Sequence, residues 1–254
     1  MERRSIMLFG CRIDVLTMDE TIQHVDEIVR ARQPRQHVVV NVAKLVAMSR
    51  DPELRAVVNG CHMVNADGMP VVWASRLLGR PLPERVAGVD LFQRLVEHCA
   101  ASGLRPYFLG AREEVVAETV RRFRVRHPAL QVAGFRNGYF SPEEEPEVAA
   151  AIRASGADLL FVAFPSPKKE MFLNRWMATM EVPFSMGVGG SFDIVAGKTK
   201  RAPVWMQATG LEWCYRLCQE PTRMWSRYAS TNPVFLWMVL RTLITGREPS
   251  LGAS

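Results

Sequence analysis

The sequence predicts an α/β protein: a Rossmann-like, mostly parallel sheet with helices on both faces, followed by a C-terminal helical appendage. Two observations support this prediction. Short apolar runs rich in β-branched residues alternate with segments of helical period, as they do in parallel sheets covered by helices. From Val204 onward the pattern becomes helical only. We therefore expect an α/β core over residues 1–203 and a helical appendage over residues 204–254.

The expected strands are short runs of mostly apolar residues, and most are followed by a segment whose apolar positions have helical spacing. The strands are expected at Ile6–Phe9, His37–Asn41, His62–Ala66, Pro106–Leu109, Gln131–Phe135, Leu159–Ala163 and Pro183–Val188. The helices are expected from Met18, at about Val42–Asn59 with an interruption near Pro52, and at Met69–Leu78, Val89–Ser102, Glu113–His127, Pro142–Ser155 and Pro167–Met180. In the appendage we expect breaks at Pro221 and Pro233, because proline lacks the N–H that an interior helical position donates.

The composition is that of an ordinary globular protein, but its charge is unevenly distributed. Of 254 residues, 48% are hydrophobic and 23% are charged, which excludes a disulfide-stapled miniprotein and long disordered segments. The formal net charge of +6 is confined to the stretch from Lys198 to Arg247, which also holds Trp205, Trp213, Trp225 and Trp237. A basic, aromatic segment on a neutral body predicts binding of something anionic, interfacial, or both.

The cysteines and the apolar runs indicate the compartment. The five cysteines are odd in number and have no CxxC spacing, which favours a reducing compartment. The first apolar run is too short for a signal peptide, and the run from Pro233 to Leu240 is shorter than the roughly 20 residues that cross a bilayer. We expect a cytoplasmic protein whose Pro233–Leu240 run is able to lie on a membrane surface.

Polar and glycine-rich residues follow the expected strands at their carboxyl ends, where open parallel sheets bind ligands. These residues are Asn41, Asp67 with Gly68, Gly110, the PSPKKE segment from Pro165 to Glu170, and the GVGGSFD segment from Gly187 to Asp193. A turn explains any one of them, but a ligand crevice better explains the whole set. Within it, Gly189 and Gly190 would let the backbone approach a ligand closely, or would serve tight packing.

Asp67 is the candidate general base. A carboxylate at the tip of an apolar strand is desolvated, which raises its pKa toward the range that a base needs. Asp67 would equally serve as the cap of the helix that begins near Met69, because aspartate is a favoured N-cap residue. Its position alone leaves both interpretations open.

Several function classes lack their motifs in this chain. Gly197-Lys198-Thr199 resembles the end of a phosphate-binding P-loop, but Phe192 stands where the first glycine is required. The missing GxGxxG after the first strand and the missing GxSxG argue against a dinucleotide oxidoreductase and a serine hydrolase. No two aspartates lie two residues apart, so the DxD pair with which many nucleotide-sugar enzymes hold a metal ion is absent. Arginines would have to neutralise any bound diphosphate.

Seven groups of residues together resemble the WecG/TagA/CpsF glycosyltransferase family in order and spacing, over about residues 35–228. They are NADG (Asn65–Gly68), RVAGVDL (Arg85–Leu91), YFLGA (Tyr107–Ala111), GYF (Gly138–Phe140), PSPKKE (Pro165–Glu170), GVGGSFD with AGKTKRAP (Gly187–Pro203) and GLEWCYRLCQEPTR (Gly210–Arg223). The resemblance implies an inverting, metal-independent enzyme without a cofactor. It would transfer a hexose or N-acetylhexosamine from a UDP-sugar to a polyprenyl-diphosphate-linked saccharide, such as one on undecaprenyl diphosphate, in surface polysaccharide or exopolysaccharide assembly.

The resemblance also implies roles for individual residues. Asp67 would be the general base, Asn41 would be an active-site asparagine, and Arg85 would contact the donor diphosphate. Arg216 and Arg223, both in the appendage, would close over the donor. The α/β core would then be the catalytic part of the chain.

The sequence departs from the family pattern at three positions. Lys169 stands where many members have glutamine, and Val39 stands where many have threonine two residues before the asparagine. Arg227 substitutes for an arginine that the family pattern places at Ser226. Because Lys169 replaces a neutral amide with a cation, contacts to the sugar or acceptor are expected to differ there. The other expected substrate-binding positions are Gly110, Gly189 and Gly190.

The basic, aromatic appendage suits an acceptor that is held at a membrane, because anionic head groups attract Lys and Arg and tryptophan rings prefer the interface. We expect a surface that binds the inner face of the cell membrane, formed by Trp225, Tyr228, Phe235, Leu236, Trp237, Val239 and Leu240 beside Arg223, Arg227 and Arg241. The alternative is a helix pair that faces the core or another copy of the chain, so a homo-oligomer remains open.

Two other function classes remain open. A non-catalytic module that binds nucleotides or nucleic acid would explain the positive charge, but no RNP-like, zinc-finger or helix-turn-helix motif accompanies it, and we expect no nucleic-acid partner. A different Rossmann-like enzyme, such as a methyltransferase, would share the fold, which alone does not determine the activity.

Overall fold

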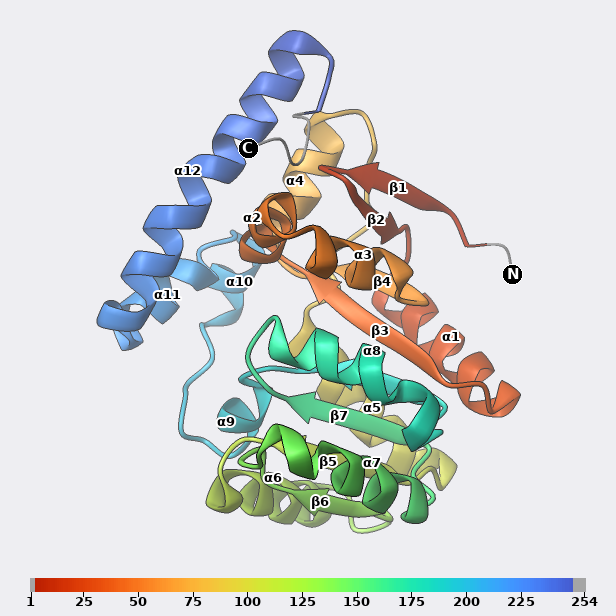
Figure 1. Cartoon of the computed structure of the whole chain (residues 1–254). Coiled ribbons are helices and arrows are strands. Elements are labelled where there is room, and N and C mark those ends of the chain that lie inside the picture. The colour runs from red at the N-terminus through yellow and green to blue at the C-terminus, as the bar shows by residue number, and fades with distance from the viewer. Residues whose placement is uncertain (1–2, 249–254) are drawn as a thin grey trace.

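The computed structural model describes residues 3–248, without the side chain of Arg223. The centre of the protein is a six-stranded parallel sheet (Figure 1). The strands lie in the order β4-β3-β8-β7-β5-β6. Their bounds are β3 Arg35–Val40, β4 Met63–Ala66, β5 Pro106–Gly110, β6 Gly134–Arg136, β7 Leu159–Ala163 and β8 Phe184–Gly187. Every pairing among them is parallel, which confirms the expected Rossmann-like α/β architecture.

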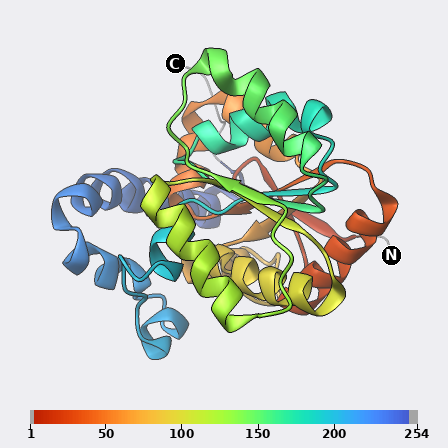
Figure 2. The ribbon, with the colours of Figure 1, turned by 90° about the horizontal axis from the view of Figure 1, so that it is seen from below.

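Helices cover both faces of this sheet (Figure 2). One face is covered by α1 (Met18–Ala31), α5 (Gly88–Ser102), α6 (Glu113–Arg126) and α9 (Ser191–Val195). The other face is covered by α2 (Val42–Arg50), α3 (Pro52–Gly60), α4 (Met69–Leu77), α7 (Glu145–Ala154), which follows a 3-10 turn at Pro142–Glu144, and α8 (Lys168–Met180). Val39 packs on the α1 and α5 side while Val38 and Val40 pack on the α2 side, because successive side chains of a strand point to opposite faces.

The connections after β3 and β8 create a crevice between these two neighbouring strands. The chain leaves β3 for α2 on one face of the sheet and leaves β8 for α9 on the opposite face. Two connections that diverge in this way leave space beyond the carboxyl ends of the strands, where open α/β sheets bind ligands.

An N-terminal hairpin, β1 (Ser5–Leu8) with β2 (Cys11–Asp14), flanks the β4 edge of the sheet. Only its first strand was expected from the sequence. Arg12 and Asp14 interrupt the apolar pattern of the second strand, but the structure pairs them at 2.7 Å. The other carboxylate oxygen of Asp14 accepts the backbone N–H of Val64 at 2.8 Å, which joins the hairpin to β4.

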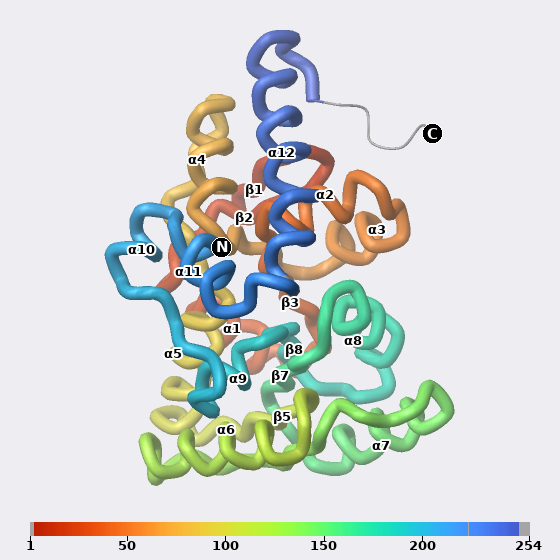
Figure 3. The backbone as a smooth tube through the Cα atoms, turned by 90° about the vertical axis from the view of Figure 1, so that its left-hand side faces the viewer, coloured from red at the N-terminus to blue at the C-terminus, as the bar shows by residue number. Residues whose placement is uncertain are grey.

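The appendage consists of α10 (Val204–Ala208), α11 (Glu212–Gln219) and α12 (Pro221–Thr245), and α12 packs along α2 (Figure 3). Phe235, Met238 and Val239 are buried in the same hydrophobic cluster as the side chains of α2 and β4. The ring of Phe235 also meets the ring of Phe9 edge to face, with centroids 5.7 Å apart. The expectation that Phe235 and Val239 face a membrane is therefore wrong, because they anchor α12 to the core.

The expected helix break at Pro233 is also wrong, because α12 continues through it. An interior proline costs a helix about 3 kcal/mol. The side chains that α12 buries contribute about 1.5–3 kcal/mol each, which together outweighs that cost. The expected break at Pro221 is confirmed, since α11 ends at Gln219 and α12 begins at Pro221.

Replacing Phe235 with alanine is expected to lower the free energy of unfolding by about 3–5 kcal/mol, because it leaves a cavity beside Phe9. Leu236→Ala is the matched control, because this neighbouring side chain is 58% exposed, and its effect is expected to stay within about 0.5 kcal/mol. Urea denaturation of both variants measures the difference. Equal effects would contradict the packing of α12 on the core.

Candidate functional site

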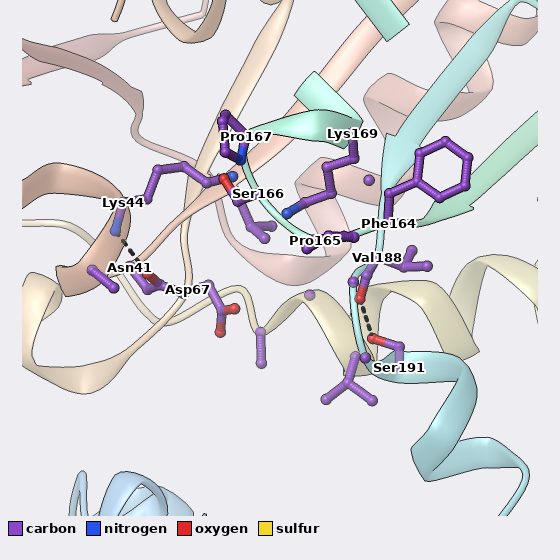
Figure 4. Close-up of a pocket in the computed structure, with 18 of the residues that line it drawn as sticks. Asn41, Lys44, Asp67, Phe164, Pro165, Ser166, Pro167, Lys169, Val188 and Ser191 are labelled. Atoms are coloured by element: carbon purple, nitrogen blue, oxygen red, sulfur yellow. Dashed lines mark hydrogen bonds between the residues drawn. The ribbon is translucent and has the colours of Figure 1, made fainter. Parts of the chain in front are cut away.

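A cavity of about 420 Å³ lies beyond the carboxyl ends of β3, β4, β7 and β8 (Figure 4). Its walls come from the segments that follow these strands and from the appendage. The structure thus brings together seven residues that the sequence singled out, namely Asn41, Asp67, Lys169, Gly189, Gly190, Arg216 and Arg227.

Asp67 follows β4, and its side chain lies in the cavity wall (Figure 4). Gly68, with φ of +134°, turns the chain into α4. Because α4 has no side-chain cap, the alternative in which Asp67 caps this helix is wrong. Burial raises the pKa of Asp67 above its ordinary value, and the charge of Glu212 raises it further, against the opposing charges of Arg85 and Arg216. A carboxylate with a raised pKa in a cavity is suited to accept a proton from a ligand.

Asn41 follows β3 and is the N-cap of α2. Its Oδ1 accepts the backbone N–H of Lys44 at 3.1 Å. This bond satisfies one of the free N–H groups of the helix and fixes the amide at the cavity wall. The role of Asn41 in catalysis stays a prediction.

Two lysines share one buried carboxylate at the cavity wall. Lys44 Nζ lies 2.5 Å from Oε1 of Glu170, Lys169 Nζ lies 3.1 Å from the same oxygen, and Ser166 donates to Oε2 at 3.0 Å. Burial, and then the positive charge of Lys44, lower the pKa of Lys169 to about 8. The stem of Lys169 passes so close to Gly187 that a Cβ there would lie 2.6 Å from the lysine Cδ. The two ammonium groups exceed the one carboxylate, so this wall of the cavity is electropositive.

Arg85 and Arg216 are joined through Glu212. Arg85 Nη1 lies 3.0 Å from Oε2 of this carboxylate, and Arg216 Nη2 lies 2.8 Å from Oε1. Arg85 belongs to the segment before α5, whereas Glu212 and Arg216 belong to α11. Glu212 and Arg216 line the cavity, so Arg85 stands behind the wall and contacts it through Glu212.

The remaining predicted positions are placed differently. Arg227 lines the cavity from α12, and its charge contributes to the lowered pKa of Lys169. The side chain of Arg223 lies outside the described residues, so its role stays a prediction. Gly110 lies on β5 away from the cavity walls, and a Cβ there would come within 2.9 Å of the backbone of Ala163. The close approach of β5 and β7 accounts for this glycine.

Ion pairs connect the linker between α9 and α10 to the core. Lys198 Nζ lies 3.1 Å from Oε1 of Glu114, and the guanidinium of Arg201 donates to both carboxylate oxygens of Asp90. Part of the positive excess of the C-terminal stretch is therefore neutralised by carboxylates of the core.

Sequence reasoning did not single out Lys44, Glu170 or Glu212 as site residues. Lys44 stands within the otherwise apolar segment VAKLVAM, which was the available sign that this lysine is buried. Glu170 and Glu212 lie within the quoted PKKE and GLEW motifs, but their spacing does not reveal which cations from distant segments they would bind.

The parallel sheet, and the cavity with side-chain cations where β3 and β8 diverge, are the features of a Rossmann-like α/β protein with a ligand site at the carboxyl ends of its strands. A family model described as "Glycosyl transferase WecG/TagA/CpsF family" matches residues 6–249. The chain belongs to this family and is a glycosyltransferase. One relative, the N-acetylglucosaminyldiphosphoundecaprenol N-acetyl-beta-D-mannosaminyltransferase of Bacillus spizizenii, is 37% identical over 192 residues, which cover 76% of this chain and 73% of the relative. The resemblance inferred from the motifs is thereby confirmed, and the interpretation as a non-catalytic module is not supported.

Lys169 is expected to make folding stability rise with pH in the alkaline range. The unfolded chain keeps the Lys169 proton up to the ordinary pKa of about 10.5, whereas the folded chain loses it near pH 8. Between these values the unfolded state binds more protons, so the free energy of unfolding increases with pH. Between about pH 8 and 10.5, the free energy of unfolding of the wild type is expected to increase by up to about 3 kcal/mol relative to that of Lys169→Met.

Urea denaturation at several pH values measures this difference. The exposed neighbour Lys168 provides the control variant Lys168→Met, which also removes a lysine from the first turn of α8. A difference between wild type and Lys169→Met that stays constant with pH would contradict the buried, partly deprotonated lysine.

Proposed function

We propose that this glycosyltransferase transfers an N-acetylhexosamine or a hexose from a UDP-sugar to a saccharide linked to a polyprenyl diphosphate, in surface polysaccharide biosynthesis. The observation that carries the proposal is Asp67, a carboxylate with a raised pKa in a cavity that also presents side-chain cations. The Bacillus relative supports the acceptor class, because its name describes an N-acetylmannosaminyltransferase that acts on N-acetylglucosaminyldiphosphoundecaprenol.

The proposed reaction is a single displacement at C1 of the donor sugar. Asp67 removes the proton from the acceptor hydroxyl while the hydroxyl oxygen forms a bond to C1. The bond between C1 and the diphosphate oxygen breaks in the same step, and UDP leaves with the bonding electron pair. The attack comes from the face opposite UDP, so the anomeric configuration inverts. The proton stays on Asp67 until water removes it after the products leave.

Side-chain cations would stabilise the leaving diphosphate in place of a metal ion. Arg216 lies at one wall of the cavity, with Arg85 behind it on the same Glu212 carboxylate, and Lys169 and Arg227 lie at another part of the cavity. Preorganised donors of this kind contribute on the order of 3–4 kcal/mol each to stabilising a transition state. The lack of a DxD pair in the sequence agrees with this route. Asn41 is the further proposed catalytic residue, and Gly189, Gly190 and Arg223 complete the proposed substrate-binding set at the cavity.

A UDP-release assay with a panel of donors tests this function. The donors are UDP-glucose, UDP-N-acetylglucosamine, UDP-N-acetylmannosamine and UDP-glucuronate, and the acceptor is a short saccharide on a lipid diphosphate. The wild type is expected to use at least one donor, and Asp67→Asn is expected to lower kcat by about 10²–10⁴-fold, because an amide does not accept the proton. UDP binding, measured by calorimetry, should be retained.

The exposed Asp19 provides the control variant Asp19→Asn, which should keep the activity of the wild type. An Asp67→Asn enzyme within a few-fold of the wild type would rule out Asp67 as the base. A wild type that releases no UDP with any donor would refute the proposed reaction.

The appendage is proposed to hold the enzyme at the inner face of the cell membrane, where a polyprenyl-linked acceptor presents its diphosphate. The large apolar side chains of α12 that are at least 48% exposed include Trp225, Leu236, Trp237 and Leu240. The guanidinium of Arg241 lies 5.2 Å from the centroid of the Trp237 ring. Tryptophan beside arginine is the combination that an anionic membrane surface favours. Over residues 3–248, none of the helices has the length and apolarity needed to cross a bilayer.

Replacing Trp225, Leu236 and Trp237 with serine is expected to weaken binding to anionic lipid vesicles by about tenfold or more, because each apolar side chain buried in lipid contributes about 1.5–3 kcal/mol. Vesicle flotation measures the bound fraction. The matched control replaces Val125 and Tyr139, which are exposed on the core, with serine. Equal binding by the two variants would count against the proposed membrane surface.

A further inference from the structure

Glu212 connects the core to the appendage at the edge of the cavity. It lies in the first turn of α11, and its side chain is 18% exposed. One carboxylate oxygen accepts from Arg85, which is 127 residues away in the chain, and the other accepts from Arg216 one turn along α11. Gln207, also in the appendage, accepts a second, longer bond of 3.4 Å from Arg85. Glu212 therefore fixes the two guanidinium groups relative to each other.

The positive charges around Glu212 are matched by carboxylates. Arg201 pairs with Asp90, and the same carboxylate lies 4.0 Å from Arg85. The guanidinium groups of Arg85, Arg201 and Arg216 thus face three carboxylates, those of Glu212, Asp90 and Asp67. When Asp67 is protonated, one positive charge beside the cavity is left without a carboxylate, and an anion that enters would neutralise it.

We propose that Glu212 is a positioning residue of the transfer reaction: its carboxylate, held by Arg85 of the core, aligns Arg216 of the appendage so that Arg216 donates to the diphosphate leaving the donor sugar. This inference rests on the proposed function. A guanidinium donates in a fixed planar geometry, so its orientation decides whether it meets a phosphate oxygen. A carboxylate shared by the two arginines supplies that orientation before the donor arrives, which is the preorganisation that lowers a barrier.

Glu212 also acts on Asp67 through its charge. After burial, it has the largest influence among those that raise the pKa of Asp67. The cations that face Asp67 and oppose this effect are Arg85, Arg216, Lys44 and Arg201. Removing the charge of Glu212 therefore lowers the pKa of Asp67. Because the base acts only when it is unprotonated, the acid limb of kcat/KM then moves to lower pH.

Two variants of Glu212 and one control variant separate the alignment of the arginines by Glu212 from the effect of its charge on Asp67. Glu212→Gln keeps the length of the side chain and an acceptor oxygen but removes the charge, whereas Glu212→Asp keeps the charge and shortens the side chain. Glu118→Gln is the matched control, because Glu118 also bridges two arginines, Arg121 and Arg122, on the surface of α6. The measurements are kcat and KM for the UDP-sugar from about pH 5 to 9.

Glu212→Gln is expected to lower kcat by about tenfold or more, which corresponds to about 1.4 kcal/mol, with a smaller change in KM. Its acid limb should also move to lower pH. Glu212→Asp should recover part of the kcat and keep the acid limb of the wild type, and Glu118→Gln should behave as the wild type. Wild-type kinetics for Glu212→Gln would overturn the inference. A loss of kcat with no movement of the acid limb would also overturn it, since this result would mean that Glu212 only supports the fold.

A second measurement separates this inference from the proposed function. The carboxyl carbon of Asp67, observed by NMR in protein with labelled aspartate and assigned by its loss in Asp67→Asn, gives the Asp67 titration without turnover. If the wild type transfers no sugar from any donor, the proposed function fails. A lower Asp67 midpoint in Glu212→Gln would still support the coupling of the two carboxylates, whereas an unchanged midpoint would overturn it.

Discussion

The packing of α12 against α2 and the N-terminal hairpin is the interaction on which the site depends. Glu212, Arg216 and Arg227 reach the cavity because the appendage is held against the core by an apolar face that includes Phe235. This burial is strong enough to carry a helix through Pro233. The core alone contributes the base candidate and the lysine cluster, so the cavity becomes a complete site only when both parts of the chain are packed together.

Burial shifts the pKa values of two cavity residues, Asp67 and Lys169, in opposite directions. It raises the pKa of Asp67 and lowers the pKa of Lys169, because removal from water disfavours a negative and a positive charge alike. Burial thus moves the pKa of each group toward neutrality from its ordinary value. An anionic ligand beside Lys169 would raise the pKa of the lysine again, so ligand binding and proton uptake would be coupled.

The sheet and part of the site could be predicted from the sequence because both follow local rules. Asn41 and Asp67 come directly after apolar strands, and the carboxyl ends of parallel strands meet at one edge. The bond between Arg85 and Glu212 joins segments whose relative placement depends on the packing of the whole chain, so no local pattern reveals it. The same reason explains why the expected helix break at Pro233 is wrong: burial of α12 side chains against the core outweighs the low helix propensity of proline.

The separation along the chain between the two halves of the site has a consequence for biosynthesis. Contacts between distant segments form slowly, because a long loop must close before they stabilise the fold. The hairpin and α2 leave the ribosome well before α12, so the apolar surface that Phe235 covers stays open to water during much of synthesis. Such surfaces attract chaperones and favour aggregation. The segment that shields this surface also delivers Glu212 and Arg216, so a nascent chain that is still at risk of aggregation does not yet contain a complete cavity.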